Sequence, residues 1–373
     1  MGRVNSPHCF RNNIGRSALK LKNIWVDRRK KISVVYRITT LLRINNRKEK
    51  NMGQLKYVLK RLFLMFFTLF VIVAICFVMI RLLPQEMPQE KNLQEVIKAR
   101  WEALGYNKPI IVQFGIYLKN IFTKWDFGTS WYVEKMTPAM DLILGKLLPT
   151  VLVNLYSLLL SIPIGIAAGV LAAVKKNKWQ DHVISTGVML FVSIPSYVYA
   201  FIVQYLLYFK LGWFDSPTVL SLADAGGSWF TPAMFKSMIM PVIALSFGSI
   251  AGLCRFTRAE LTETLTSDYM LLARTKGLTR AQATTRHALK NAMVPILPMI
   301  ISSFIGILGG SMIIEQIFSI PGVGQLYIKA VQLLDYDVFM ADSIFYTFVS
   351  LLAGIVVDIS YGFIDPRIRM GER

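Results

Sequence analysis

The side chains best placed to act on another molecule lie in a cationic segment, residues 255–292, which separates two long apolar stretches. It carries seven Lys or Arg residues against three acidic residues. An excess of positive charge attracts acidic surfaces, so the expected chemistry is electrostatic docking rather than bond making. We expect at least one of Arg274, Lys276 and Arg286 to contact a protein partner, although the same charges also suit a cytosolic loop beside a membrane.

The chain lacks the sequence motifs of covalent catalysis and nucleotide binding. It contains no GxxxxGKS/T phosphate loop, no HExxH zinc motif and no GxSxG nucleophile turn. Its three cysteines, Cys9, Cys76 and Cys254, form no CxxC pair, and its three histidines are far apart in sequence. A disulfide framework and a metal site are therefore not expected. We predict that the chain is not an enzyme and binds no cofactor or metal of its own.

The cationic segment is predicted to fold as two short helices joined at a glycine. Ser267 suits the N-cap of the first helix, and Gly277 suits the left-handed residue that ends it. Thr279 and Gln282 match a capping box, which would start the second helix. We expect that helix to run until Pro295, because proline lacks the amide hydrogen that a continuing helix needs.

The first of these helices carries an apolar strip that a partner could cover. Tyr269, Met270, Leu272 and Ala273 fall on one side of it at helical spacing. In the second helix, His287 is expected to hold the helix in place rather than to donate a proton. The segment therefore predicts a knob that a membrane protein presents to a cytosolic partner.

The sequence as a whole is too apolar for a soluble domain of its size. Hydrophobic residues make up 54% of its 373 positions, and its mean hydropathy is +0.47. A membrane-spanning helix needs about 20 mostly apolar residues. Six segments satisfy this length, so we predict an all-α integral membrane protein with spans at roughly 62–83, 147–174, 183–209, 235–254, 293–314 and 338–364.

The charges between the spans indicate how the chain is oriented. Lysines crowd the loop at 175–182, whereas the loops at 210–234 and 315–337 are net acidic. By the positive-inside rule, the 175–182 loop, the cationic segment and both termini are cytosolic. The chain is therefore predicted to cross a membrane several times.

Two further features concern packing and the external face. The insert at 85–146 falls outside the membrane, and Trp101, Trp125 and Trp131 are expected to anchor it at the interface. Gly165 and Gly169 form a GxxxG pattern. We expect this pattern to serve packing within the helix bundle rather than dimerisation.

The amino-terminal tail is strongly basic. Residues 1–51 hold 14 Lys or Arg against Asp27 and Glu49, which accounts for +12 of the net charge of +20. The tail shows no nucleic-acid-binding signature, so attraction to anionic membrane lipid is the expected role. Met52-Gly53 also resembles a start of translation, and we expect the preceding residues to be dispensable or absent from the native protein.

Several separated motifs resemble those of ABC-importer permeases of the dipeptide and oligopeptide type, in the form of their oligopeptide-permease B subunit. In the cationic segment the matching residues are Arg258, Asp268–Tyr269, Ala273–Arg274, Lys276–Leu278, Arg286–Leu289, Asn291–Ala292 and Pro295. Elsewhere they are Leu104–Pro109, Asp126–Ser130, Leu148–Thr150, Ser193–Pro195, Leu211–Trp213, Glu315, Ile317–Gly324, Asp358, Tyr361 and Asp365–Arg369.

The resemblance implies a type I ABC-importer permease fold with a cytosolic coupling helix, and a location in a bacterial plasma (inner) membrane. It also implies four partners: a homologous second permease subunit, two cytosolic ABC ATPase subunits that hold ATP–Mg, and an external peptide-binding protein. The implied ATPase-coupling residues are Tyr269, Leu272, Ala273, Arg274, Lys276, Gly277, Leu278, Arg286, His287 and Asn291. A segment with Glu315, Pro321, Gly322 and Gly324 is expected near the outer gate.

The expected function is therefore the transmembrane pore of an ATP-driven importer of di- and oligopeptides. Its predicted parts are a basic tail at 1–52, a first span with an external insert at 53–146, and a permease core of five spans at 147–373. Two alternatives stay open. Nickel or another small solute is one, because nickel permeases share these motifs, and a membrane sensor or scaffold with the same docking segment is the other.

Overall fold

The computed structural model describes residues 56–83 and 91–364, and the side chains of 94–360 after the gap. The chain divides into two compact units, Met1–Arg61 with Arg369–Arg373, and Leu62–Ile368. Of the first unit only residues 56–61 are described, and they begin the first span. The predictions for the basic tail, the Met52 start and the motif at Asp365–Arg369 lie outside the described residues. All that follows concerns the larger unit.

A module that the charge distribution predicts to be external, and that is named the external module for this reason, follows the first span, Lys56–Leu82. Its elements are two helices and a short antiparallel hairpin in which Thr129 pairs with Pro138: α2 (Lys91–Ala103), α3 (Ile110–Lys124), β1 (Thr129–Ser130) and β2 (Thr137–Pro138). The interior face of α3 packs against the first span through Phe77 and Tyr117, whose rings lie 5.3 Å apart. The module is therefore fixed to the first span near its carboxyl end.

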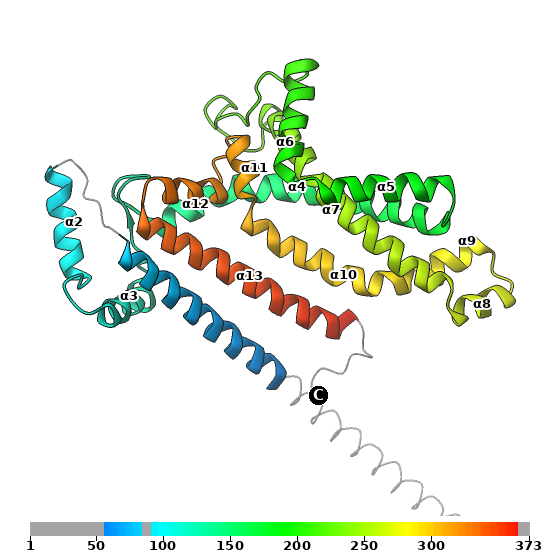
Figure 1. The fold of residues 1–373 in the computed structure, drawn as a ribbon, viewed down its shortest axis with the longest axis horizontal. Coiled ribbons are helices and arrows are strands. Elements are labelled where there is room, and N and C mark those ends of the chain that lie inside the picture. The colour runs from blue at the N-terminus through cyan, green and yellow to red at the C-terminus, as the bar shows by residue number, and fades with distance from the viewer. Residues whose placement is uncertain (1–55, 84–90, 365–373) are drawn as a thin grey trace, which may run out of the picture. The chain divides into compact units, whose positions relative to one another are not determined.

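The membrane core follows, and Figure 1 shows its long helices side by side. Its first half consists of α4 (Ala139–Val174), α5 (Trp179–Ser193), α6 (Ser196–Gln204), the π-helical turn η1 (Tyr205–Lys210) and α7 (Pro232–Leu265). Its second half consists of α8 (Asp268–Thr275), α9 (Arg280–Ala283), the π-helical turn η2 (Thr284–Ala288), α10 (Leu289–Gly306), the 3-10 turn η3 (Ile307–Gly309), α11 (Met312–Ile317), α12 (Val323–Gln332) and α13 (Tyr336–Ile364).

All six predicted spans correspond to apolar helices in the described residues. Five are single helices long enough to cross a membrane, and the sixth is the pair α5 and α6–η1, bent by 102°. The bend falls at Ile194 and Pro195, where Ile194 is extended with φ −88° and ψ 127°. Proline forces this conformation on the residue before it, so the helix breaks there. The second span begins at Ala139 rather than near 147, which lengthens it toward the external module.

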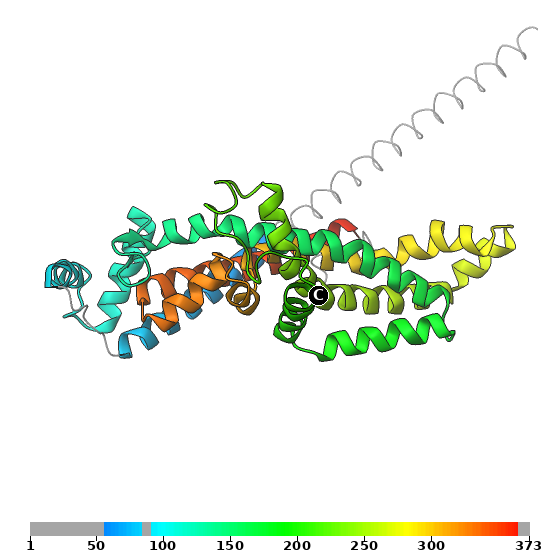
Figure 2. The same ribbon diagram turned by 90° about the horizontal axis from the view of Figure 1, so that it is seen from above.

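The helix pair with the most extensive contact in the core is α4 with α7, which Figure 2 shows running alongside each other with α5 next to them. Gly165 and Gly169 lie at their contact. A Cβ on Gly165 would come within 2.8 Å of Leu253 Cβ, and one on Gly169 within 2.7 Å of the Cys254 carbonyl oxygen. The GxxxG pattern therefore serves packing within the chain, as predicted, because only glycine permits this approach.

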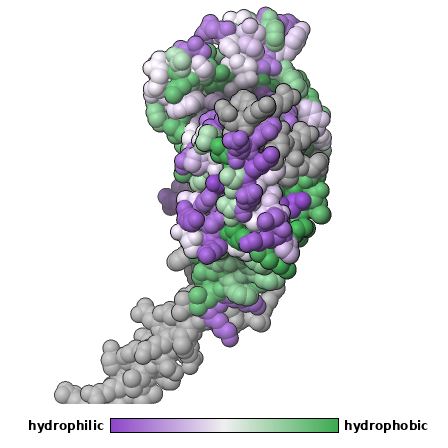
Figure 3. Space-filling view, turned by 90° about the vertical axis from the view of Figure 1, so that its left-hand side faces the viewer, coloured by the Kyte–Doolittle hydropathy of each residue, from purple (hydrophilic) through white to green (hydrophobic). Residues whose placement is uncertain are grey.

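Two separate cores hold the opposite ends of this bundle. At the end that carries the external module, the start of α4 packs with α12 and the start of α13 through Ala139, Ile143, Val323 and Val338. Figure 3 looks onto the side that carries α2 and α3, where hydrophilic residues gather across the middle with hydrophobic bands beside them. At the other end, the last turns of α4 and α7 pack with α8, α9 and α10.

Candidate functional site

The candidate site is the helix–turn–helix of α8, Gly277 and α9 at the end of α7. Ser267 occupies the N-cap position of α8 with extended backbone, but its side chain makes no cap hydrogen bond. Its hydroxyl instead donates to the Thr264 carbonyl oxygen at 2.6 Å. The predicted side-chain cap is therefore wrong in its bonding, because the last turn of α7 offers an acceptor that competes for the hydroxyl.

The apolar residues of α8 are divided between an inner and an outer face. Met270 and Ala273, three residues apart, are buried in the core shared with α7, α9 and α10. Tyr269, Leu271 and Leu272 are exposed by 39%, 67% and 56%. The prediction of one exposed strip is thus wrong for Met270 and Ala273 and misses Leu271. The inner pair fixes α8, and the outer three are free for a partner.

Gly277 makes the turn that the sequence predicts. Its φ of +89° lies in the left-handed region, which costs glycine little. Its amide donates to the Arg274 carbonyl oxygen at 3.0 Å, and the Leu278 amide donates to the Ala273 carbonyl oxygen at 3.3 Å. These two bonds form a Schellman motif, in which Leu278 also packs beside Ala273. The turn therefore seals the end of α8 and directs the chain into α9.

The second helix starts with the predicted capping box but does not end at Pro295. Thr279 Oγ1 accepts from the Gln282 amide, and the Gln282 side chain accepts from the Thr279 amide. The helix then continues through η2 and α10 as a single 30-residue span, Arg280–Gly309. The predicted end at Pro295 is wrong. In a bundle within the membrane, neighbouring helices satisfy the backbone groups that an interior proline frees.

The basic residues of α8, of the turn after it and of η2 point to solvent. Arg274, Lys276 and Arg286 are exposed, as are His287 and Asn291. None of the three cations forms an ion pair with a described residue, so all three are available to a partner. His287 makes no hydrogen bond with the described part of the chain, and its role in fixing the helix stays a prediction.

An ion pair that sequence reasoning did not single out braces the same end of the bundle. Arg258 of α7 donates from Nε and Nη2 to the two carboxylate oxygens of Asp181 in α5, at 2.6 and 2.8 Å. Asp181 also accepts from the Asn177 amide and the Ser185 hydroxyl. Its side chain is 2% exposed, and bidentate pairs of this kind are geometrically specific. The pair joins α5 to α7 just before α8.

The predicted outer-gate residues form a second, compact arrangement at the opposite end. Glu315 of α11 is buried, and its carboxylate accepts from the Thr150 hydroxyl and the Gln325 amide, both at 3.0 Å. The Thr150 hydroxyl oxygen also accepts from the Val323 amide at 2.9 Å. Burial raises the pKa of Glu315, and these hydrogen bonds oppose that shift.

Glycines make room for this carboxylate. A Cβ on Gly322 would collide with the Thr150 hydroxyl and the Glu315 carboxylate, and one on Gly324 would lie 2.9 Å from Met312 Cα. Pro321 is half-buried in the loop that leads into Gly322. The four predicted residues are thus brought together, and the loop between α11 and α12 is locked onto α4 through Thr150.

Comparison with known proteins shows which family the chain belongs to. Residues 165–370 match the model of the inner membrane component of binding-protein-dependent transport systems. Residues 54–138 match the amino-terminal model of such membrane components. The chain belongs to this family. It is a multi-pass membrane protein and the permease subunit of an ABC importer, whose ATPase is a separate subunit, so the chain is not itself an enzyme. The predicted all-α permease fold is confirmed.

Individual relatives of this permease carry peptide-related names. The dipeptide transport system permease protein DppB of Lactococcus lactis subsp. cremoris (strain MG1363) is 35% identical over 316 residues, which cover 84% of this chain and 99% of that protein. The glutathione transport system permease protein GsiC of Escherichia coli (strain K12) is 32% identical over 320 residues, with coverage of 84% and 99%. Among solved structures, the inward-facing methionine ABC transporter MetNI aligns with a TM-score of 0.47 at 17% identity, covering 61% of this chain and 97% of that one.

Proposed function

We propose that this permease forms one half of the pore of an importer for di- and oligopeptides. A homologous second permease would supply the other half, two cytosolic ATPases would hold ATP–Mg, and an external peptide-binding protein would deliver the substrate. The relatives named for dipeptide and glutathione transport support a peptide substrate. Both chain termini would be cytosolic, in line with the distribution of lysines and arginines between the spans.

The observation that carries the proposal is the two-faced construction of α8. Its outer face offers Leu271 and Leu272, with Arg274 and Lys276 beside them, all exposed. Its inner face is fixed to three spans through Met270 and Ala273. An ATPase that gripped the outer face would therefore move α4, α7 and α10 together with α8. This is the mechanical coupling that a permease without a nucleotide motif requires.

The loop that carries Glu315 has a different place in this proposal. It is tied to the outer end of α4, so a displacement of α4 would carry the loop with it. We assign Glu315, Pro321, Gly322 and Gly324 to a rigid contact at the outer gate. This contact keeps the loop between α11 and α12 bound to α4 while the spans move. The substrate itself would be recognised mainly by the external binding protein.

The test compares solute uptake in cells with the gene intact, deleted, or carrying Leu272→Asp. Labelled di- to pentapeptides, glutathione and nickel are offered separately. We expect peptide uptake to be lost in the deletion and reduced about tenfold or more by Leu272→Asp, because a carboxylate on the outer face of α8 would have to be desolvated against the ATPase. Leu222→Asp, at an exposed leucine of the external loop, serves as the matched control and leaves uptake unchanged.

Binding measurements separate a coupling defect from a folding defect. The Leu272→Asp permease should reach the membrane in normal amount but retain less ATPase on purification. Loss of nickel uptake with normal peptide uptake would instead establish the metal alternative. Unchanged fluxes of all three solutes in the deletion strain would contradict an importer role and favour the sensor.

A further inference from the structure

Helix α3 of the external module keeps a large apolar surface exposed. Ile111 and Phe122 are exposed by 82% and 83%, more than any other large apolar side chain of the described residues. Trp125, which directly follows the helix, is exposed by 69%. Apolar surface that gathers in this way marks contact with a protein partner or with a membrane.

Around the helix axis, this exposed face adjoins the face that α3 buries. The buried face packs on the first span, and its members recur at helical intervals: Ile110, Phe114, Tyr117 and Ile121. Ile111 and Phe122 each follow one of these residues directly, so they are turned from it by about 100° rather than by half a circle. Lys119 and Thr123, on the far side, are exposed and polar. The apolar arc of α3 is therefore wider than the first span covers.

The first span shows how deep in a membrane α3 lies. Its uncharged part, residues 62–80, ends at Arg81 and covers roughly 28 Å at about 1.5 Å per residue, close to the ~30 Å of the hydrocarbon layer. The ring of Phe114 lies 5.7 Å from that of Phe70 and 5.2 Å from that of Phe77. Phe114 is therefore level with a point roughly 10 Å inward from Arg81 along the span, which is membrane depth.

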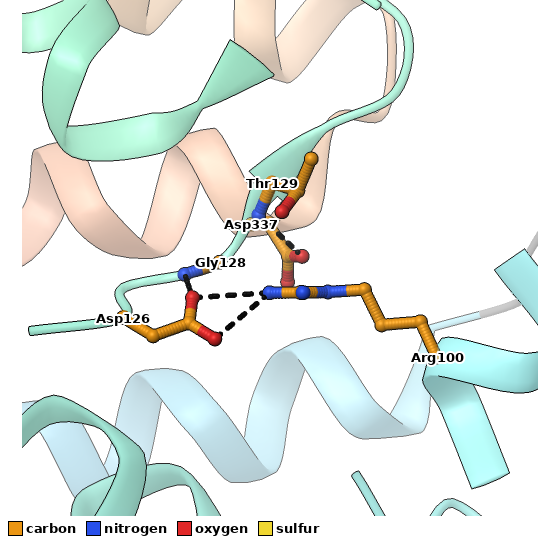
Figure 4. A network of polar contacts seen from close by, with 5 residues as sticks. All are labelled: Arg100, Asp126, Gly128, Thr129 and Asp337. Carbon is orange, nitrogen blue, oxygen red and sulfur yellow. Dashed lines mark hydrogen bonds and ion pairs between the residues drawn. The ribbon is translucent and has the colours of Figure 1, made fainter. Parts of the chain in front are cut away.

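Polar contacts fix the segment that follows α3. Figure 4 shows Arg100 of α2 bound to both carboxylate oxygens of Asp126, at 3.0 and 3.1 Å. Asp126 also accepts from the Gly128 amide at 2.9 Å, and Asp337 of α13 accepts from the Thr129 amide at 3.1 Å. These contacts tie the end of α3 to α2 and to a spanning helix. The exposed face of α3 is therefore a fixed surface of the module.

Of the three tryptophans expected at the membrane interface, Trp125 is the one whose ring is free to reach it. Trp131 is 8% exposed and packs with Ile97 and Trp101 inside the module. Trp101 also stacks on Tyr106, with ring centroids 4.9 Å apart. This packing differs from the interface anchoring predicted for both residues.

We propose that α3 is an interfacial helix, immersed in the lipid leaflet on the side of the external module. Ile111, Phe122 and Trp125 contact lipid chains, and Lys119 faces the headgroup phosphates. Helices of this kind bury their apolar face about 5–10 Å into the boundary between headgroups and acyl chains. The contacts of Phe114 with Phe70 and Phe77 place α3 at that depth.

The exposed surface of the first span favours lipid over a protein as the occupant. Phe70 is 49% exposed while its ring also touches Phe114, so the surface that the span offers to lipid continues onto α3. A bilayer that surrounds the span therefore meets α3 without any further partner. The placement depends neither on the transported solute nor on ATPase coupling.

The experiment measures the depth of single spin labels on the full-length chain in lipid nanodiscs. Cys9→Ser and Cys76→Ala remove two cysteines, while Cys254, which is 1% exposed, stays in place. The parent chain with these two substitutions gives the background labelling. The test label is introduced with Phe122→Cys. Val96→Cys, at an exposed apolar residue of α2, is the matched control in the same module.

We expect the label at Phe122→Cys to collide severalfold more often with oxygen, which dissolves in the bilayer, than with a water-soluble nickel complex. Its depth should be about 5–10 Å below the phosphates. Labels at Val96→Cys and Lys119→Cys should favour the nickel complex. A Phe122→Cys label that behaved like the Val96→Cys label would place this face in water and overturn the proposal. Few collisions with either reagent would also overturn it, because protein would then cover the face.

A second measurement needs no cysteine substitution. Lipids with bromine atoms on the upper part of their acyl chains quench the fluorescence of tryptophans that touch them. Trp125→Phe should lower the quenched part of the emission, whereas Trp131→Phe, at a buried ring, should leave it unchanged. Equal quenching in the wild type and in Trp125→Phe would contradict lipid contact at the end of α3.

Discussion

At the scale of single residues, Gly277 is required for its backbone conformation rather than for close packing against its neighbours. Nothing lies within 4 Å of the position that a Cβ would take, so a side chain would meet no steric obstacle. The constraint is the φ of +89°, a region that disfavours residues with a Cβ by about 1–2 kcal/mol. Residue choice at this position is therefore a matter of conformation alone.

This distinction gives a graded prediction at Gly277. Gly277→Asn should keep most peptide uptake, because asparagine tolerates the left-handed region, whereas Gly277→Val should lower it several-fold. Gly145→Val is the control, since Gly145 has equally open surroundings without a positive φ. Uptake of a labelled dipeptide is the measurement. Equal loss in the Asn and Val variants would show that bulk, and not backbone conformation, is what matters.

Glu315 gives a prediction on pH. Burial raises its pKa in the folded chain, so the folded state holds the proton more tightly than the unfolded state. Its contribution to the free energy of unfolding is then greatest below the unfolded pKa and falls as pH rises through the folded pKa. Glu315→Gln removes that titration and should flatten the fall of Tm as pH rises above the ordinary pKa of glutamate, about 4.3. An unchanged slope in purified protein would contradict this reading.

At the scale of elements, the contact of α4 with α7 is where a small change should cost most. Gly169→Ala would place a Cβ 2.6 Å from Thr257 Cβ, which forces the helices apart. Overpacking of this kind costs about 1–3 kcal/mol, so Tm in detergent should fall by several degrees. Gly187→Ala, where nothing lies within 4 Å, should leave Tm within error. A Gly169→Ala protein with the Tm of the wild type would show that α4 and α7 can move apart enough to accommodate the added methyl group.

The elements also show how far sequence reasoning reaches. Gly277 and the capping box at Thr279 were predictable because their hydrogen bonds close within a few residues. The burial of Met270 was not, since it depends on where α10 packs. The bonds of Asp181 to Arg258 and of Asp335 to Ser130 join residues 77 and 205 positions apart. No local pattern marks such partners, whereas apolar length alone was enough to locate the spans.

At the scale of the whole permease, the two ends of the described part of the chain carry different features. The end with α8 offers exposed cations and leucines, and the other end carries the external module and the Glu315 loop. In the described residues, the chain connects the two ends only through its six spans: the first span, α4, the bent span, α7, the span with α10, and α13. A signal between the ends must therefore travel as a displacement of whole helices.

The core that joins α8 to these helices has an unusual composition. Of its seven buried residues, five are alanines: Ala173, Ala273, Ala283, Ala288 and Ala292. Alanine has no rotamers to exchange, so this joint has little means of absorbing a push by rearranging its side chains. A core made of leucines or methionines would absorb part of a displacement by changing side-chain rotamers. Built mostly from alanine, with Leu261 and Met270 as its only larger buried members, this joint should pass most of a movement of α8 on to the spans.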